Sequence, residues 1–264
     1  MDSQTQHPSF LAVPARPAKP RSSGVTHVLD GGLDLLSTRA ALDAVAPLVD
    51  IWKFGWGTAY LDRQLADKLD ALRGASVLSC TGGTLLEIAW VQERTAGFFD
   101  WVVEVGMDCV EVSNGATGLP VTAKRELMAT ALDRGLTVLS EVGSKDPDAE
   151  VDADEWVEEI VGDLAAGATW VVAEGRESGT VGMYDADGEV RHDVVDAIDA
   201  EVAADRIIYE APRRRQQAAL LRRFGPSVNL GNITTSDVAS VESLRAGLRT
   251  DTMGISTTIG SALA

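Results

Sequence analysis

Charged and amide side chains recur directly after short apolar runs along this chain of 264 residues. The set comprises Asp30, Lys53, Glu111, Glu141, Glu174, Glu210, Asn229 and Asn232, with Lys145 and Arg176 a few residues beyond two of them. Carboxylates that face one cavity repel each other, and a hard divalent cation bound through oxygen relieves this repulsion. If the fold brings these positions together, the pattern predicts an enzyme site that holds Mg2+.

Zinc is disfavoured as the metal because the sequence has no cluster of nitrogen and sulfur ligands. The histidines are His7, His27 and His192, and neither Cys80 nor Cys109 has metal-ligand spacing around it. His27 lies within an apolar run, where a structural role is expected and a substrate contact is the alternative. The cysteines are expected to be buried free thiols, which predicts a reducing, cytoplasmic location.

The segment 174–179, EGRESG, has the composition of an anion-binding loop. It combines a strand-end acid with the guanidinium of Arg176 and with Ser178 and Gly179, which are small enough to let backbone amides approach an oxyanion. Such a loop suits a phosphate or a carboxylate. The alternative is an ordinary glycine-rich turn with a surface arginine.

Other turns offer further anion contacts. The loop 231–234 opens a helix, and in barrel enzymes this region often supplies amides to a phosphate. Arg245 and Arg249 lie four apart and share a face of that helix, which is either solvated, paired with acids or turned toward a ligand. No Ser-His-Asp order, nucleophile elbow or Walker loop is visible. The substrate-binding positions predicted beside the 174–179 loop are Gly83, Thr84, Glu210, Asn229 and Asn232.

The elements that must position these residues form a repeating pattern. Each apolar, β-branched run is followed by a longer stretch with helical spacing, near 37–47, 60–73, 84–105, 120–134, 152–166, 192–204, 213–223 and 236–249. Eight such units predict a closed parallel (β/α)8 barrel of the TIM type, in which all strand ends converge on one mouth. An open doubly wound sheet is the alternative, although the G-x-G-x-x-G fingerprint is absent. The predicted strands are 25–29, 49–54, 75–80, 109–113, 137–140, 169–173, 206–209 and 227–230.

Length and composition fit one barrel domain. Hydrophobic residues make up 45% and charged residues 24%, and the net charge is −17. So acidic a chain is not expected to bind nucleic acid or an anionic membrane, and no apolar run is long enough to cross a bilayer. Residues 1–23 contain four prolines and are predicted to be a flexible tail, with the barrel over residues 24–264. We expect a homo-oligomer.

Nine strings in order resemble the phosphosulfolactate synthase family, over about residues 24–254. Members of that family are (β/α)8 barrels that use magnesium to add sulfite to phosphoenolpyruvate, giving 2-phospho-3-sulfolactate, a sulfonate, early in coenzyme M biosynthesis. A plant branch associated with heat stress shares the fold. The strings are GVTHVLDGG, KFGWGT, GGTLLE, VEVSNG, SEVGSKDP, EGRESG, YEAP, VNLGNI and SLRAGLRTDTMG.

The resemblance assigns roles to individual residues. It implies that Lys145 is the general acid and that Lys53 and Arg176 hold the substrate anions, small species such as phosphoenolpyruvate and sulfite. We therefore predict Lys145, Lys53 and Glu141 as catalytic residues. The acids that the resemblance implies for magnesium are Glu174, Glu141, Glu111 and Asp30.

Three positions depart from the family pattern. Gly31 and Ser144 stand where the family commonly has lysine, and Asn114 stands where it commonly has an acid. The loss of two cations leaves room for a different nucleophile with phosphoenolpyruvate or a similar enol acid. A non-catalytic, stress-associated barrel is the third interpretation, and the retention of Lys145 and Glu141 counts against it.

Overall fold

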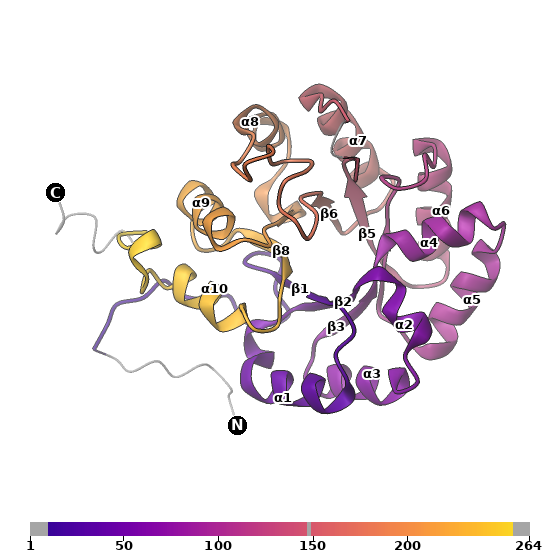
Figure 1. The fold of residues 1–264 in the computed structure, drawn as a ribbon, viewed down its shortest axis with the longest axis horizontal. Helices are drawn as coiled ribbons and strands as arrows, with labels where there is room; N and C mark the ends of the chain where they lie inside the picture. The colour runs from indigo at the N-terminus through magenta and orange to yellow at the C-terminus, as the bar shows by residue number, and fades with distance from the viewer. Residues whose placement is uncertain (1–9, 147–148, 256–264) are drawn as a thin grey trace.

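A closed barrel of eight parallel strands forms the centre of the computed structural model, which describes residues 10–146 and 149–255 (Figure 1). Each strand pairs with the next along the chain, and the last pairs with the first. The prediction of a single (β/α)8 barrel is therefore confirmed. The strands are β1 (Thr26–Asp30), β2 (Ile51–Phe54), β3 (Leu78–Thr81), β4 (Cys109–Val112), β5 (Thr137–Val142), β6 (Trp170–Ala173), β7 (Ile207–Glu210) and β8 (Asn229–Ile233).

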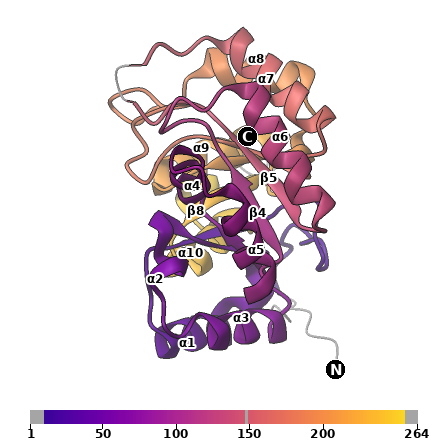
Figure 2. The same ribbon diagram turned by 90° about the vertical axis from the view of Figure 1, so that its right-hand side faces the viewer.

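Helices surround the strands, as Figures 1 and 2 show. The predicted helix over 84–105 is two helices, because the chain turns at Glu93, whose φ of 55° is not helical. The stretch 60–73 is likewise divided. The α-helices are α1 (Leu35–Val45), α2 (Thr58–Leu61), α3 (Leu65–Gly74), α4 (Gly83–Val91), α5 (Thr95–Val105), α6 (Val121–Asp133), α7 (Ala153–Ala165), α8 (His192–Glu201), α9 (Arg214–Phe224) and α10 (Val238–Arg245), and the 3-10 turns are η1 (Ala46–Leu48), η2 (Gly55–Gly57), η3 (Ala204–Arg206) and η4 (Thr250–Thr252).

Strand alternation places apolar and charged residues in successive layers inside the barrel. Side chains two apart on a strand face the same way, so the residue that follows a buried apolar one by two positions also points inward. A larger apolar cluster fills the space between the strands and the helices. The inner apolar layer is Val25, Ile51, Cys80, Cys109, Leu139, Val172 and Ile208, and it includes both cysteines, which are free and buried as predicted.

The inner layer forms a floor beneath the charged side chains. On five strands the floor residue is followed two positions later by a lysine or a glutamate, which must lie at the carboxyl end of the barrel. The pairs are Ile51 and Lys53, Cys109 and Glu111, Leu139 and Glu141, Val172 and Glu174, and Ile208 and Glu210.

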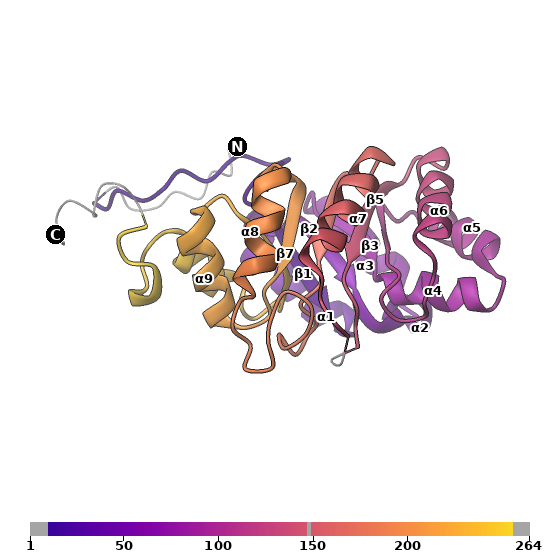
Figure 3. The ribbon, with the colours of Figure 1, turned by 90° about the horizontal axis from the view of Figure 1, so that it is seen from above.

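The segment before β1 packs across the amino end of the barrel, on the side away from the loops that follow β5 and β6 (Figure 3). Lys19 donates to the carbonyls of Ala46 and Val49, at 3.2 and 2.6 Å, and Arg21 pairs with Asp50 at 2.8 Å. The predicted tail, residues 1–23, therefore includes side chains that contact the barrel, while its first nine residues lie outside the described residues. None of the described helices is long and apolar enough to cross a membrane.

Candidate active site

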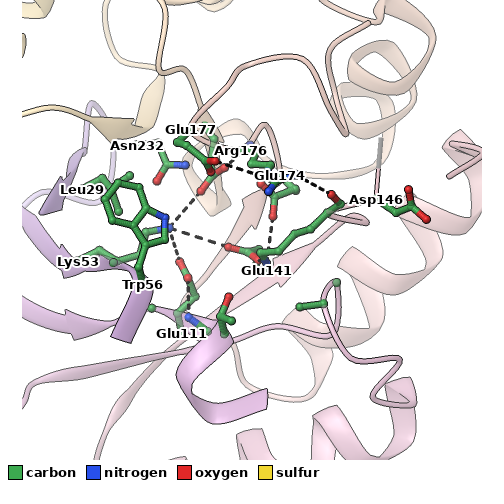
Figure 4. A pocket seen from close by; sticks show the side chains of 18 residues that line it. Leu29, Lys53, Trp56, Glu111, Glu141, Asp146, Glu174, Arg176, Glu177 and Asn232 are labelled. Atoms are coloured by element: carbon green, nitrogen blue, oxygen red, sulfur yellow. Dashed lines mark hydrogen bonds and ion pairs between the residues drawn. The ribbon is translucent and has the colours of Figure 1, made fainter. Parts of the chain in front are cut away.

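A cavity of about 570 Å3 opens at the carboxyl ends of the strands (Figure 4). Its walls come from the ends of β1, β2, β4, β5, β6, β7 and β8 and from the loops that follow β2, β3, β4, β5 and β6. The barrel thus brings together residues more than 200 positions apart in the sequence. The lining residues are Leu29, Lys53, Gly55, Trp56, Gly82, Gly83, Thr84, Glu111, Gly115, Ala116, Glu141, Lys145, Asp146, Glu174, Arg176, Glu177, Glu210 and Asn232.

Lys53 lies at the base of this cavity among three glutamates. Its Nζ is 3.0 Å from Oε2 of Glu111, 3.1 Å from Oε1 of Glu210 and 3.9 Å from Oε2 of Glu141. Burial disfavours the charged ammonium, but the three carboxylates outweigh burial and hold the pKa of Lys53 well above its usual value. Lys53 is therefore a fixed positive charge at the bottom of the site.

Lys145 bridges two of the carboxylates from the loop after β5. Its Nζ contacts Oε1 of Glu141 and lies 3.1 Å from Oε2 of Glu174. Burial opposes the charge, but the two glutamates raise the pKa of Lys145 above its usual value. For Glu141, burial favours the acid form, yet Lys145 and Lys53 lower its pKa to about 2. This pair is therefore an ammonium and a carboxylate at neutral pH.

Two further glutamates of the cluster, Glu111 and Glu174, are harder to ionise. Burial, with Glu141 and Glu210 nearby, raises the pKa of Glu111 to about 7 despite the opposing effect of Lys53. Burial and the same two carboxylates raise the pKa of Glu174 well above its usual value. Oε2 of Glu174 is buried and accepts no hydrogen bond, so its contact is the ion pair with Lys145. Crowded carboxylates of this kind are typical of functional sites.

The cavity carries excess negative charge when all its groups are ionised. Three cations line it, Lys53, Lys145 and Arg176, against six acids, which leaves a formal charge of −3. An anionic substrate can bind there only if protons or further cations reduce this charge. The acids are Glu111, Glu141, Asp146, Glu174, Glu177 and Glu210.

The residues of this site fit a magnesium ion that takes one or two carboxylates from the protein. Among residues 10–146 and 149–255, no group of three or more His, Cys, Asp or Glu side chains could hold a metal ion by itself. Mg2+, however, often uses only one or two carboxylates, with substrate oxygens and water as its other ligands. Glu174, with a buried oxygen that accepts no hydrogen bond, and its neighbour Glu141 match that requirement.

Most of the predicted site residues lie on this cavity. All three predicted catalytic residues line it, and so do three of the four predicted metal ligands. The alternation of buried and charged residues on the strands explains the agreement. The predicted residues in the lining are Lys53, Gly83, Thr84, Glu111, Glu141, Lys145, Glu174, Arg176, Glu210 and Asn232.

Asp30 is placed away from the cavity, contrary to its predicted role as a metal ligand. Its Oδ1 accepts hydrogen bonds from the amides of Gly32 and Leu33, both at 2.7 Å, and its Oδ2 accepts one from Trp52 Nε1 at 3.0 Å. Asp30 is one position out of step with the inward-facing residues of β1, so its carboxylate fixes the turn after the strand instead.

Asn229 and Asn232 lie at opposite ends of β8. The side chain of Asn229 bonds to the Val25 amide and to the carbonyls of Asp205 and Ile207, at the amino end of the barrel, so its predicted substrate contact is not supported. Asn232 reaches the cavity because β8 carries an extra residue: Thr26 pairs with Leu230 and Val28 with Ile233.

The loop after β6 reaches the cavity only through its first residues. Arg176 lines the wall, and its guanidinium donates to the Lys145 carbonyl at 3.1 Å. The predicted binding residues Ser178 and Gly179 are outside the lining, since Ser178 bonds to Thr180 and Gly179 packs on Gln216.

Two further predictions can be compared with the structure. Arg245 is buried at the amino end, where it donates to the carbonyls of Val25, Pro226 and Val228, so it contacts no ligand at the mouth. His27 is fully buried in the barrel, and neither ring nitrogen has a hydrogen-bond partner. Burial, with Lys53 nearby, lowers the pKa of His27 well below its usual value, so the ring is neutral.

Glu87, in α4, supports the site although it was not among the predicted residues. It is fully buried and accepts hydrogen bonds from the amides of Ala116 and Thr117, at 2.9 and 2.8 Å, and from Thr117 Oγ1 and Ser113 Oγ. This carboxylate therefore fixes the loop after β4. The signal in the sequence is an acid within the apolar segment LLEIAWV.

Strained backbone is concentrated at the cavity. Five non-glycine residues in the described chain have a left-handed φ, and three of them line the wall: Trp56 at 52°, Arg176 at 58° and Asn232 at 53°. Such conformations cost about 1–3 kcal/mol each and persist where the surrounding structure enforces them, commonly at functional sites. No composition or spacing rule identifies these residues from sequence.

Comparisons with known proteins agree with this picture. Residues 14–251 match the model of the (2R)-phospho-3-sulfolactate synthase family. The chain is 40% identical over 246 residues to phosphosulfolactate synthase of Methanothermobacter thermautotrophicus, covering 91% of this chain and 95% of the relative. It is 38% identical to phosphosulfolactate synthase of Bacillus subtilis, covering 92% and 97%. The fold also resembles 3-hexulose-6-phosphate synthase of Salmonella typhimurium, with a TM-score of 0.55, 15% identity and coverage of 84% and 99%.

Proposed function

Because this chain belongs to the phosphosulfolactate synthase family, a family of lyases that form carbon–sulfur bonds, we propose that it joins sulfite to phosphoenolpyruvate. The observation that carries the proposal is the Lys145 ammonium between Glu141 and Glu174, above the fixed charge of Lys53. This arrangement combines a proton donor with cations for an anionic substrate. The product is (2R)-2-phospho-3-sulfolactate.

The reaction balances with one proton. The sulfur lone pair of sulfite attacks the methylene carbon of phosphoenolpyruvate, and the electrons of the carbon–carbon double bond move toward the carboxylate. The resulting enolate-like dianion then takes a proton at the carbon that bears the phosphate. Positioned cations stabilise charge that develops in this way, as in enolase-type sites.

Lys145 is the group best suited to deliver that proton. The two glutamates raise its pKa and keep the ammonium protonated at neutral pH, and its Nζ lies at the cavity wall beside them. A cation bound to those glutamates would lower this pKa and let the ammonium release its proton. After it gives up the proton, the amine recovers one from solvent, because the Lys145 side chain is 23% exposed. Lys53 is too deeply buried among carboxylates to exchange a proton as readily, so it holds the substrate anion instead.

Magnesium is part of the proposal. The residues that would hold it are Glu174 and Glu141, and the bound ion would supply positive charge against the developing enolate. The excess of acids over cations at the cavity supports this assignment. Chelation with EDTA should abolish activity and Mg2+ or Mn2+ should restore it without zinc; full activity after exhaustive chelation would contradict the assignment.

The test of the reaction is direct. The protein is incubated with phosphoenolpyruvate, Mg2+ and a panel of nucleophiles that includes sulfite, and the products are identified by mass spectrometry. A product with the mass of phosphosulfolactate, formed only with sulfite and absent with Lys145→Ala, is the expected result. A product with another nucleophile alone would overturn the choice of sulfite.

A related enzyme that uses a different nucleophile is the second candidate. It is favoured by Gly31 and Ser144, which stand where the family commonly has lysine, and by the negative sum of charges at the cavity. The nucleophile panel separates the two candidates. A cytoplasmic location is also part of the proposal, supported by the free buried thiols of Cys80 and Cys109.

A further inference from the structure

The indole of Trp56 covers one side of the cavity in an unusual conformation. Trp56 has φ 52° and ψ 29°, its side chain lines the cavity, and it is 62% exposed (Figure 4). A large apolar ring that is mostly exposed on a strained backbone gains little from burial. Its position therefore points to a role at the mouth of the site.

Gly31 makes the position of this ring possible. A Cβ atom at Gly31 would lie 2.3 Å from Cζ3 of Trp56, closer than atoms can approach, and 3.1 Å from Cη2, which is a tight contact. The backbone itself does not need glycine there, because the φ of Gly31 is outside the left-handed region, unlike that of Gly32 at 110°. Room for the indole is thus the structural reason for glycine at position 31.

We propose that Gly31 and Trp56 act as a pair that determines substrate specificity, an inference that rests on the function proposed above. The other large apolar side chain of the lining is Leu29, and most of the remaining wall is charged or polar. Lys53, Lys145 and Arg176 attract the carboxylate and phosphate groups of an enol acid. The uncharged methylene end is then left to lie against the indole, which orients it for attack.

The pair also explains a departure from the family pattern. Any side chain at position 31, including the lysine that the family commonly carries, would need the volume that the Trp56 ring occupies here. Trp56 itself belongs to KFGWGT, one of the strings that resemble the family, so glycine at position 31 changes where the ring lies and not which residue carries it. The wall favours the carbon skeleton of the substrate over a further anionic group at this side of the mouth.

The contact is suited to a mutational test. The atoms that a Cβ at Gly31 would meet belong to the outer end of the Trp56 ring, which has open space because the ring is 62% exposed. Gly31→Ala should thus move the ring outward and leave the fold intact. Gly97→Ala is the matched control, because a Cβ at Gly97, in α5, meets nothing within 4 Å.

The first experiment is a double-mutant cycle with Gly31→Ala and Trp56→Ala, measured as kcat and as KM for phosphoenolpyruvate. Each single variant should raise KM about tenfold with kcat changed less than about threefold, and the double variant should match Trp56→Ala alone. Gly97→Ala should behave as the parent protein. An unchanged KM in Gly31→Ala would overturn the proposal. So would a double variant whose KM is raised by the product of the two single effects, because the two residues would then act independently.

A second measurement needs no turnover. Acrylamide quenching of Trp56 fluorescence is measured by difference. The parent is compared with Trp56→Phe, and Gly31→Ala is compared with the double variant Gly31→Ala, Trp56→Phe. Gly31→Ala should raise the quenching constant of Trp56 by about half or more, because the ring leaves the wall. An unchanged constant overturns the paired role. A raised constant without any turnover of phosphoenolpyruvate means instead that the pair controls the ring and that the proposed reaction is wrong.

Discussion

The two ends of this barrel use buried charge in opposite ways. At the amino end, Arg245 donates to three carbonyls and Asp50 accepts from the Thr26 amide and from Arg21. At the carboxyl end, Lys53 and Lys145 share four glutamates, of which Glu111 and Glu174 have raised pKa values.

This difference separates stability from function. Buried polar groups that find hydrogen-bond partners hold a fold together, and at the amino end both terminal nitrogens of Arg245 do so, although its Nε does not. A crowded set of like charges instead costs free energy that a ligand can recover. Substitutions at the amino end should therefore lower the free energy of unfolding and spare turnover. Substitution of Glu111 or Glu174 at the carboxyl end should lower turnover and leave stability unchanged or higher.

The largest effect is expected at Lys145. Lys145→Ala removes the proposed proton donor and should lower kcat about 10²- to 10⁴-fold. Lys145→Arg keeps the charge but hardly releases a proton, so it should bind phosphoenolpyruvate and remain slow. Steady-state kinetics and a binding measurement on both variants test this. Near-normal turnover in Lys145→Arg would show that the residue only anchors an anion.

Arg245 provides the opposite case at the amino end. Arg245→Met removes the arginine donor from the carbonyls of Pro226 and Val228, and leaves the Val25 carbonyl with the Leu230 amide alone. This should cost about 3 kcal/mol of unfolding free energy. The kcat of the folded variant should stay within about twofold of the parent, because the side chain is at the end of the barrel away from the mouth. Urea unfolding and kinetics on the same preparation measure both quantities. A large fall in kcat without loss of stability would show that buried charge at the amino end also serves catalysis.

Glu87 tests whether a buried carboxylate near the mouth behaves like one at the amino end. Its loop includes Gly115, whose carbonyl accepts from the Lys145 amide at 3.1 Å, so the backbone links Glu87 to the proposed proton donor. Glu87→Gln should lower kcat about 10- to 100-fold with a smaller change in KM. The matched variant is Asp50→Asn, which should lower stability and spare kcat. Equal effects of the two variants on kcat would mean that Glu87 is only structural.

The pKa of Glu111 predicts a pH effect of intermediate size. Its folded pKa, about 7, is above that of an unfolded glutamate, near 4.5, so its stabilising contribution is complete below about pH 4.5 and is lost as the pH rises through 7. Between pH 5 and 8 the parent should therefore lose about 2 kcal/mol relative to Glu111→Gln. Thermal unfolding of both proteins across this range tests the sign. A difference that grows in the opposite direction would contradict it.

Sequence patterns predicted the barrel well because its strands repeat one motif. The alternation of Ile51 with Lys53, or of Leu139 with Glu141, specifies both the floor and the mouth once a parallel barrel is assumed. Asn229 was misplaced because the predicted strand 227–230 puts it near a carboxyl end, whereas β8 begins at Asn229. Asn232 depends on a different feature. Asn229 and Asn232 belong to one strand, and only the extra residue in β8 decides that Asn232 faces the cavity. A bulge of this kind leaves no clear trace in one sequence.

The residues that the sequence did not reveal act through tertiary contacts. In the sequence, Glu87 is an ordinary acid on a predicted helix. Its role depends on amides of a loop some 30 positions away. Trp56 and Gly31 are likewise 25 positions apart, and their relation depends on the strained backbone at Trp56. Spacing rules describe neighbours on one element and cannot report contacts between elements.

The smallest effect is expected from removing the segment before β1. Deleting residues 1–22 removes the contacts of Lys19 with η1 and leaves Asp50, which is 7% exposed, without the guanidinium of Arg21. An uncompensated buried carboxylate is destabilising, but Asp50 keeps the Thr26 amide as a donor and lies near solvent once the segment is gone. The deletion should therefore cost about 1–2 kcal/mol and lower Tm by several degrees, while kcat and KM stay those of the parent. Arg21→Ala alone should account for about half of this loss. A Tm within a degree of the parent for both proteins would show that these contacts contribute nothing to stability. A fall in kcat would show that the amino end of the barrel is coupled to the active-site cavity.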